Sequence, residues 1–346
     1  MDRPPLFGKT LEELRELAES WGLKPFVGNQ IAQGLYKRRV SSFEGLTDVA
    51  KTVRERLDAE FSLGLQTHSK VDASIDGTRK YLFPAAGRFV EAAYIPDDDR
   101  KTLCLSTQVG CKMGCLFCMT GKQGFQAQLT PGEIVNQIRS LPEGPELTNV
   151  VYMGMGEPLD NLENTLKSLD ILTADWGLGF SPNRVTVSSV GLLPALETFF
   201  SRSKARLALS LHNPFEDERR KILPVQNVHA LSDVLAFMRA AQKTDGRRLS
   251  IEYIAFDGVN DTPRHVKELV RILHGLKIRI NLIRFHPIPD TPLLGSTEQN
   301  LERMRDALVE KGIPATVRRS RGQDIYAACG LLSTKTLLKP APVEDF

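Results

Sequence analysis

Hydrophobic residues recur with a helical period near the start of the chain. From Leu11 to Trp21 the apolar side chains return every three or four positions, which is the pattern of a helix with one buried face. Thr10 precedes this stretch and is followed three positions later by Glu13, so the pair forms a capping box that begins the helix. The helix is expected to end near Gly22.

The period then changes from helical to alternating. Two further helices are predicted over residues 30–38 and 48–61, and with the first they form a small helical module. Between residues 67 and 96 apolar and polar residues alternate, interrupted by turn sequences such as Asp76-Gly77. This stretch predicts two or three short antiparallel strands.

From residue 102 onward, short β-rich runs alternate with helix-like segments. Six strands are predicted, over residues 103–107, 149–153, 184–190, 206–211, 249–254 and 278–285. The first helix among them has Thr130 as N-cap, Pro131 at its first position and Glu133 closing a capping box. The last helix is expected to begin at Ser296, with Gln299 at its third position.

Repeated βα units predict an α/β fold with a parallel sheet, and six of them suit a partial (β/α)6 barrel. A doubly wound sheet is the alternative, and in both architectures ligands gather at the carboxyl ends of the strands. We expect a helical module over residues 1–65, a small β segment over 66–98, the partial barrel over 99–335 and a tail over 336–346.

The composition is that of a globular protein with one large and one smaller domain. Of the 346 residues, 41% are hydrophobic and 25% are charged. No window approaches the roughly 20 apolar residues that span a bilayer, and the N-terminus lacks an apolar run after a basic stretch. We therefore expect a cytoplasmic protein without membrane contact. The net charge of +3 permits nucleic acid binding through local basic patches but does not argue for it.

The cysteines carry the candidate chemistry. Four of the five lie between Cys104 and Cys118, and in a reducing cytosol such crowding favours metal binding or catalysis over disulfides. Cys111, Cys115 and Cys118 have C-x3-C-x2-C spacing on a glycine-containing loop after the first predicted strand. Three thiolates leave one iron of a cubane cluster open, and an open iron can chelate a substrate.

A structural zinc site is the alternative, with Cys104 as the fourth ligand. Zinc ribbons usually have two separated C-x2-C pairs, which this sequence lacks, so the spacing favours the cluster.

The cysteine motif at the end of the first strand resembles the radical S-adenosylmethionine (SAM) superfamily. That resemblance implies a [4Fe-4S] cluster on Cys111, Cys115 and Cys118, with SAM bound to the fourth iron. The flanking sequence is similar to the RNA adenine-C2 methyltransferases, the dual-specificity enzymes of 23S rRNA and tRNA, from about residue 10 to about 332. The matching motifs are Cys104, Gly-Met-Gly-Glu-Pro at 154–158, Ser-Leu-His-Asn-Pro at 210–214, Ile-Glu-Tyr-Ile at 251–254 and Gly-Gln-Asp-Ile-Tyr-Ala-Ala-Cys-Gly at 322–330.

The resemblance implies a mechanism that uses two SAM per turnover. Carbon 2 of adenine is electrophilic, so a nucleophilic attack on the SAM methyl group cannot methylate it. One SAM is expected to methylate Cys329, and a second, cleaved reductively, to remove a hydrogen from that S-methyl group. The methylene radical adds to carbon 2. Cys104 then frees the RNA, and Glu91 accepts the carbon-2 proton.

Without the resemblance, the positions of Cys329, Glu91 and Cys104 are also explained by ordinary structural roles. Cys329 in Ala-Ala-Cys-Gly could be a small buried apolar residue. Glu91 lies in an alternating stretch and would by default face solvent. Cys104 alternates with Leu103 and Leu105 in a strand, so its side chain faces opposite to theirs and is consistent with pointing into the site.

The SAM contacts are expected at strand ends. Gly156 lets the backbone approach a ligand closely, and the carboxylate of Glu157 can accept hydrogen bonds from the methionine ammonium group of SAM. The residues that match the ribose- and carboxylate-contacting positions of the family are Ser188, Ser210, Leu211 and His212. His286 departs from the family, which usually has an asparagine contacting SAM there; histidine can also donate or accept a hydrogen bond.

RNA is the expected partner, and four basic runs, 37–39, 219–221, 247–248 and 318–321, are candidate phosphate contacts. Charge runs are more often solvated faces. The target adenine must be unstacked to reach a buried cluster, which favours loops and bulges.

We also expect a monomer that takes electrons from a flavodoxin or ferredoxin. Two alternatives are methylation of adenine carbon 8, the chemistry of a sister group, and a zinc-stapled RNA-binding protein without catalysis.

Overall fold

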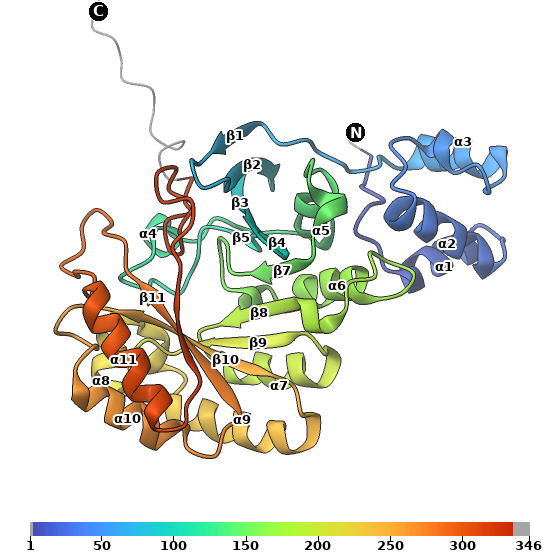
Figure 1. Ribbon diagram of the computed structural model, residues 1–346. Coiled ribbons are helices and arrows are strands. Elements are labelled where there is room, and N and C mark those ends of the chain that lie inside the picture. The colour runs from blue at the N-terminus through green and yellow to red at the C-terminus, as the bar shows by residue number, and fades with distance from the viewer. Residues whose placement is uncertain (1–2, 335–346) are drawn as a thin grey trace, which may run out of the picture.

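The computed structural model describes residues 3–334, and a ten-stranded mixed sheet forms its centre (Figure 1). The strands lie in chain order: β1 (Lys70–Ala73), β2 (Arg79–Ala85), β3 (Arg88–Asp97), β4 (Arg100–Cys104), β7 (Asn149–Tyr152), β8 (Val185–Ser189), β9 (Arg206–Ser210), β10 (Leu249–Ala255), β11 (Ile278–Arg284) and β12 (Ala315–Arg318). Pairing is antiparallel from β1 to β4 and parallel from β4 to β12. A separate two-stranded sheet joins β5 (Gln108–Val109) and β6 (Ala127–Gln128). The predicted α/β fold with a central parallel sheet is confirmed.

All six predicted parallel strands are present, and β12 is a seventh that the sequence pattern did not predict. β12 reads Ala-Thr-Val-Arg and has only one buried residue, so it lacks the apolar run that marked the equally short β7. The first strand begins earlier than expected, at Arg100, because a tight turn pairs Arg100 with Asp97 of β3. The antiparallel strands β1 to β3 therefore extend the sheet beyond β4, the first of its parallel strands.

Helices cover one face of the parallel strands. They are α5 (Pro131–Arg139), α6 (Leu162–Thr173), α7 (Leu193–Arg202), α9 (Leu231–Asp245), α10 (Pro263–Leu273) and α11 (Glu298–Glu310), with the short α4 (Met119–Gln123) and α8 (Glu216–Ile222) in loops. The predicted capping box of Thr130 and Glu133 begins α5. The cap of α11 is Thr297 and not Ser296, because the Ser296 hydroxyl is bonded to Asp261 at 2.6 Å.

The two faces of the parallel sheet differ in polarity. The face under the helices carries residues such as Val150, Val187 and Leu207, all fully buried in the main core. Side chains alternate between faces along a strand, so the opposite face carries neighbours such as Ser188 and Glu252. A buried polar face on parallel strands is unusual and marks the face on which a ligand site can be built.

The helical module precedes the sheet and consists of α1 (Leu11–Ser20), α2 (Pro25–Ala32) and α3 (Lys51–Glu60), with a π-helical turn at Gln33–Lys37. The predicted capping box begins α1. α2 begins earlier than expected, because Pro25 suits the first turn of a helix.

The module packs on the sheet's helices. The ring of Tyr36 meets the edge of Trp176 at 5.7 Å, and the Asn136 side chain of α5 bonds both backbone groups of Gln66. Figure 1 shows the module beside α5 and α6, at the far side of the molecule from α11.

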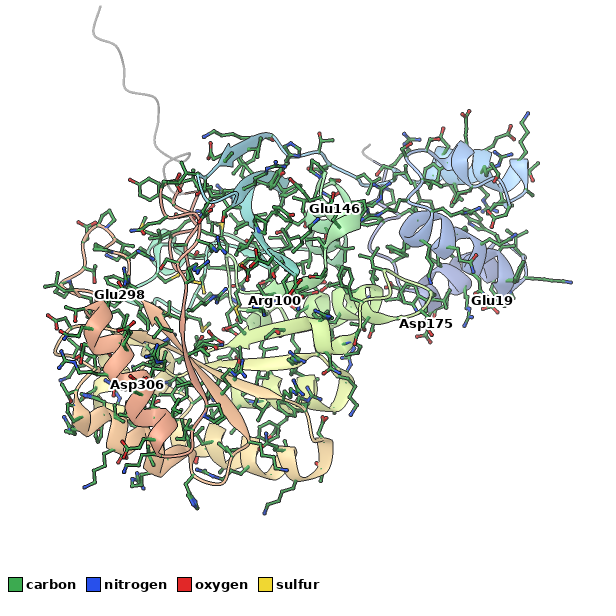
Figure 2. The ribbon with its side chains drawn as sticks, in the orientation of Figure 1. Glu19, Arg100, Glu146, Asp175, Glu298 and Asp306 are labelled. Carbon is green, nitrogen blue, oxygen red and sulfur yellow. The ribbon has the colours of Figure 1, made fainter. Side chains whose placement is uncertain are left out.

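Charged residues line the outside of the helices. Glu19, Glu298 and Asp306 are exposed, and Figure 2 shows them at the periphery. Among residues 3–334 no helix has the length and apolar composition needed to cross a membrane.

One side chain completes the sheet at the end of β4. Ser106 is fully buried just after the strand, and the Gln137 amide of α5 accepts from its N–H at 2.8 Å and donates to its C=O at 2.9 Å. The amide thus replaces a neighbouring strand where the first loop of the site begins.

We predict that Gln137→Ala destabilises the protein by about 2 kcal/mol or more, because it leaves two buried backbone groups unpaired. Gln33→Ala, at an exposed position of the helical module, should stay within about 0.5 kcal/mol. Chemical denaturation of both variants checks this, and equal destabilisation would contradict the role of the amide.

Candidate active site

The three clustered cysteines lie together on the loop between β5 and α4. Cys111 and Cys115 are buried and Cys118 is half-buried. The second half of the loop is held at two points, since Leu116 N–H donates to Ile222 C=O at 3.1 Å and Met119 N–H donates to Gly330 C=O at 2.8 Å. The predicted loop is therefore formed, and it is tied to the segment that carries Cys329.

Gly110 makes the turn into this loop. Its φ is +73°, and a Cβ there would lie 1.7 Å from the carbonyl oxygen of Gly124. Only glycine fits this position, because the backbone conformation and the close approach both exclude a side chain.

Burial keeps the thiols of Cys111 and Cys115 neutral in the absence of a positive partner. It raises the pKa of Cys111 to about 12 and that of Cys115 well above its ordinary value, and the sulfur of Cys118 adds to both effects. Iron would supply the missing positive charge and replace the protons. The donor set therefore fits an iron–sulfur cluster.

Cys104 belongs to a different place in the molecule. It ends β4 and packs with Ala93 and Ala327. Burial raises the pKa of its thiol to about 12, the nearby Cys329 adds to the rise and Arg318 opposes it.

A zinc ion needs four ligands around one point. Cys104 packs with Ala93 and Ala327, whereas Cys115 and Cys118 belong to a separate hydrophobic cluster. The arrangement thus gives no support to Cys104 as the fourth ligand of a zinc ion.

The glycine-rich loop after β7 approaches the loop after β4. Gly156 has φ +101°, and a Cβ there would come within 2.6 Å of the Gln108 side chain. The carboxylate of Glu157 is buried and accepts from Leu159 N–H at 3.2 Å and Val190 N–H at 3.1 Å. Burial raises the pKa of Glu157 to about 7. A cation beside it would stabilise the charged form.

The next two strand ends meet beside this loop. The hydroxyls of Ser188 and Ser210 are 3.4 Å apart across β8 and β9. Leu211 is fully buried, and its N–H donates to Glu252 C=O. His212 has φ +56° and accepts the Ile254 N–H at Nδ1, 3.0 Å away. The predicted residues at the ends of β8 and β9 are thus close together.

His212 is a neutral imidazole. Burial, together with the charge of nearby Arg219, lowers its pKa to about 3. Because Nδ1 accepts a hydrogen bond, the ring proton is on Nε2.

His286 is also buried, and its pKa is lowered by burial and by Arg284. Its Nε2 lies 2.9 Å from the Ser320 hydroxyl, so the substitution for asparagine is accommodated by a bond to the segment after β12.

Glu91 is buried on β3, where the alternating pattern alone favoured solvent. Its carboxylate pairs with Lys80 at 3.0 Å and accepts the Ser333 N–H at 2.9 Å. Burial raises the pKa of Glu91 although Lys80 lowers it. Glu91 shares a face of β3 with Ala93, which pairs directly with Cys104.

Cys329 is exposed on the segment after β12. This C-terminal segment (320–334) crosses from the last strand back to the first ones. Asp324 accepts from the Ser74 hydroxyl at 2.5 Å, and the Thr120 hydroxyl donates to Leu332 C=O at 2.7 Å. The segment brings Cys329 near Cys104 and at the same time near the cluster loop.

Arg219 is a functional residue that sequence reasoning misassigned. It is 1% exposed, so it cannot contact RNA phosphates. Its guanidinium donates to the carbonyls of Leu211, Val190 and Ser210 and to the Gln226 side chain, at 2.7 to 3.1 Å. It fixes the loops after β8 and β9. Its position inside a basic run gave no signal of burial.

The other basic runs also divide by burial. Arg247 is buried and donates to three backbone carbonyls, so it too is structural. Arg321 pairs with Asp97, and Arg318 turns inward toward Met153. The basic side chains of these runs that are exposed are Lys37, Arg38, Arg220, Lys221, Arg248 and Arg319.

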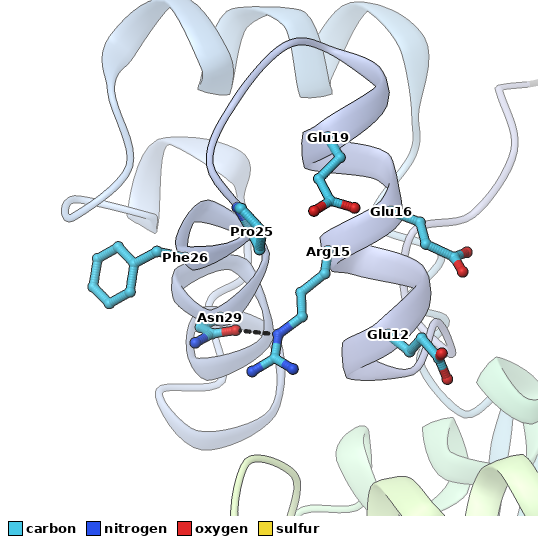
Figure 3. Close-up of a pocket in the computed structure, with 7 residues that line it drawn as sticks. All are labelled: Glu12, Arg15, Glu16, Glu19, Pro25, Phe26 and Asn29. Atoms are coloured by element: carbon cyan, nitrogen blue, oxygen red, sulfur yellow. Dashed lines mark hydrogen bonds between the residues drawn. The ribbon is translucent and has the colours of Figure 1, made fainter.

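A surface groove lies between α1 and α2 of the helical module, as Figure 3 shows. Glu12, Glu16 and Glu19 line it, and its single cation, Arg15, is bonded to Asn29 at 2.7 Å. Three carboxylates repel phosphate. If the module contacts RNA, it does so on another face.

Comparison with known proteins places this site in a family. A family model described as "Ribosomal RNA large subunit methyltransferase N-terminal domain" matches residues 5–63, and the "Radical SAM superfamily" model matches residues 105–273. A Porphyromonas gingivalis protein described as "Probable dual-specificity RNA methyltransferase RlmN" is 50% identical over 330 residues, 95% of this chain and 96% of that protein. The chain belongs to the RlmN family.

Two further comparisons agree with this assignment. The "Dual-specificity RNA methyltransferase RlmN" of Syntrophus aciditrophicus is 40% identical over 342 residues, 97% of this chain and 98% of that protein. The crystal structure of a radical SAM methyltransferase from Sphaerobacter thermophilus has a TM-score of 0.88 at 36% identity, over 95% of this chain and 99% of that chain. As a radical SAM methyltransferase of the RlmN family, the chain uses a [4Fe-4S] cluster and SAM.

The Glu157 carboxylate predicts how SAM binding depends on pH. We expect Glu157 to accept hydrogen bonds from the SAM ammonium group in its charged form, and burial raises its pKa to about 7. SAM affinity should therefore fall about tenfold from pH 8 to pH 6.

Without SAM, the raised pKa has the opposite effect. The folded protein prefers Glu157 protonated, so the protein is most stable below the ordinary glutamate pKa of about 4.5. It loses stability as the pH rises from there through about 7, because the buried carboxylate becomes charged. Calorimetric titration and thermal melting of wild type and Glu157→Gln check both effects, since the glutamine variant should show neither pH dependence. A wild-type affinity that does not change with pH would contradict the prediction.

Arg219→Met should destabilise the protein by about 3 kcal/mol or more, because four buried acceptors lose their donor. Arg220→Met alters the exposed neighbour and should stay within about 0.5 kcal/mol. Denaturation curves and SAM titrations measure both, and we expect only Arg219→Met to weaken SAM binding.

Proposed function

We propose that this enzyme methylates carbon 2 of adenine in 23S rRNA and tRNA, with S-methylcysteine at Cys329 as intermediate and two SAM per turnover. The observation that carries the proposal is that Cys104 and Cys329, far apart in sequence, lie near each other and apart from the three cluster cysteines. A cluster enzyme that used only its cluster and SAM would not need this second thiol pair. The relatives named as dual-specificity RNA methyltransferases support the choice of RNA.

The cofactor sites follow from the same geometry. Cys111, Cys115 and Cys118 would hold the cluster. The residues that would hold SAM are Gly156, Glu157, Ser188, Ser210, Leu211, His212 and His286. Once bound, the cluster and SAM supply the radical that activates a methyl group. The protein supplies the ammonium acceptor at Glu157 and the neutral His212, fixed in one tautomer by Ile254.

Cys329 suits the role of methyl carrier. It is exposed on the C-terminal segment, so SAM and RNA can both reach it, and the segment is tied to the cluster loop through Gly330 and Met119. Cys104 is buried at the end of β4, so its thiol is shielded from solvent and can attack the carrier sulfur directly.

Glu91 suits the role of proton acceptor. A base works best with a pKa near the operating pH, and burial raises the pKa of Glu91. Lys80 and the Ser333 N–H hold the carboxylate in place. The hydrogen bond from Ser333 also links the base to the segment that carries Cys329.

The partners follow from the chemistry. Exposed cations, among them Lys37, Arg220 and Arg319, are the candidate phosphate contacts. A one-electron donor of the flavodoxin or ferredoxin type would supply the electron that cleaves SAM. We further propose that the enzyme acts in the cytoplasm as a monomer.

Mass spectrometry of RNA digests tests the proposal. RNA from cells that express the enzyme should contain 2-methyladenosine, which cells lacking it should not contain. 8-Methyladenosine in its place would assign the enzyme to the carbon-8 chemistry instead. Cys329→Ala should abolish methylation, and full activity of this variant would refute the carrier role.

Cys104→Ala provides the reciprocal test. It should still bind iron but accumulate RNA attached covalently to Cys329, seen as a slow band that ribonuclease removes. The double variant Cys104→Ala/Cys329→Ala should form no such adduct, and an adduct in it would place the attachment elsewhere.

A further inference from the structure

Cys329 lies on a stretch of chain that no helix or strand holds in place. Residues 319–334 form turns and irregular backbone only. Such a stretch keeps one position only where other parts of the molecule bind it. At its far end the C-terminal segment is bonded to α4 through the carbonyls of Gly330 and Leu332. A second attachment lies before Cys329.

The second attachment is the turn between β1 and β2 (74–78), which bonds Asp324. The Ser74 hydroxyl donates to Oδ1 of Asp324 at 2.5 Å, and the Ile75 N–H donates to Oδ2 at 3.2 Å. One turn therefore holds both carboxylate oxygens. Figure 1 shows the C-terminal segment, in red, reaching the end of β1.

The turn also holds Gly322 from its own side. Oδ2 of Asp76 accepts the Gly322 N–H at 2.8 Å, and Oδ1 accepts the Thr78 N–H at 2.9 Å. Burial raises the pKa of Asp76, but hydrogen bonds from Thr78 and Gly322 outweigh it and lower the pKa to about 2. Gly322 has φ +61°, and a Cβ there would lie 2.8 Å from the side chains of Thr78 and Ala327. The turn and the segment are thus in direct contact, with a glycine where they meet.

The residues that follow this attachment pack on Cys104. Ala327 lies in the same small apolar cluster as Cys104, and Ile325 packs against that cluster. The Ala327 N–H donates to the Gly322 C=O at 2.8 Å, so a short turn leads from the attachment into the packed stretch. Cys329 follows two residues after Ala327.

We propose that the β1–β2 turn is a positioning element for Cys329. Through Asp324 and Gly322 it holds residues 325–329 on the sheet. The Cys329 sulfur is thereby kept where it can meet the Cys104 sulfur. The inference rests on the proposed function, in which these two sulfurs react with each other. Attachment at the far end alone would leave the near part of the segment free to move, and groups that meet less often react more slowly.

The test measures how readily the two sulfurs form a disulfide with each other. Cluster-containing protein, without RNA or SAM, is equilibrated anaerobically with mixtures of reduced and oxidised glutathione, and the Cys104–Cys329 disulfide is quantified by peptide mass spectrometry. Each protein disulfide forms as one oxidised glutathione is reduced to two thiols. The equilibrium constant therefore measures the effective concentration of one sulfur at the other. Cys104→Ala supplies the background.

In Asp324→Ala the equilibrium constant should fall about tenfold or more, because the segment loses both bonds from the turn to this carboxylate. Asp324→Asn keeps one acceptor oxygen and should lose less. Gln323→Ala, at the exposed neighbouring position, should stay within about twofold of wild type. Iron content and melting temperature of each variant establish that it is folded.

A double-mutant cycle shows whether Asp324 acts through the turn. Ser74→Ala removes one donor and should lower the constant by itself. The double variant Ser74→Ala/Asp324→Ala should be no worse than Asp324→Ala, because the two side chains share one contact. Fully additive losses would mean that Asp324 acts elsewhere, and they would overturn the proposal.

An Asp324→Ala constant equal to wild type would also overturn the proposal, as would an equal loss in Gln323→Ala, which indicates a general loosening of the segment. A wild-type protein that forms no Cys104–Cys329 disulfide would overturn it too, because the sulfurs would not meet. None of these measurements involves methylation. A wild-type enzyme that fails to form 2-methyladenosine would thus refute the proposed function without affecting this result.

Discussion

The site depends on the hydrogen bonds that hold the C-terminal segment against the first part of the sheet. The Gly330 carbonyl accepts from Met119 at the cluster loop, and the Ser333 N–H donates to Glu91 on β3. These contacts join residues more than two hundred positions apart. Without them Cys329 would have no fixed relation to Cys104, to the cluster loop or to Glu91. The open edge of a curled sheet is thus completed by a segment that also carries a reactive group.

Buried polar side chains hold the remaining loops of the site. Arg219 bonds the carbonyls after β8 and β9, and the Gln137 amide bonds both backbone groups of Ser106 after β4. The Asn260 side chain donates to the carbonyls of His212 and Ile254. A strand end that turns toward a ligand loses its neighbours in the sheet, so side chains must satisfy its backbone groups. These residues are therefore as necessary to the site as those that face it.

Local patterns predicted the local structure well. The capping boxes of Thr10 and Thr130 and the six β-rich runs depend on neighbours in sequence, and the structure contains them. β12 was missed because its four residues include only one buried side chain, unlike the apolar run of the equally short β7. The cap of α11 shifted by one residue because the Ser296 hydroxyl bonds Asp261. Burial of basic residues was also unpredictable, since Arg219 and its exposed neighbour Arg220 look alike in sequence.

The sequence by itself determined the three cluster cysteines, because their spacing on one short loop brings them together whatever the rest of the chain does. The strand alternation before the loop indicated only that Cys104 faces opposite to Leu103 and Leu105, and its separate role was implied by the family resemblance. Only the tertiary structure decided which groups surround Cys104: Ala93 of β3 and Ala327 of the C-terminal segment, which also carries Cys329. That relation depends on how far the sheet curls and where the segment returns. Both result from packing across the whole barrel, which no local spacing encodes.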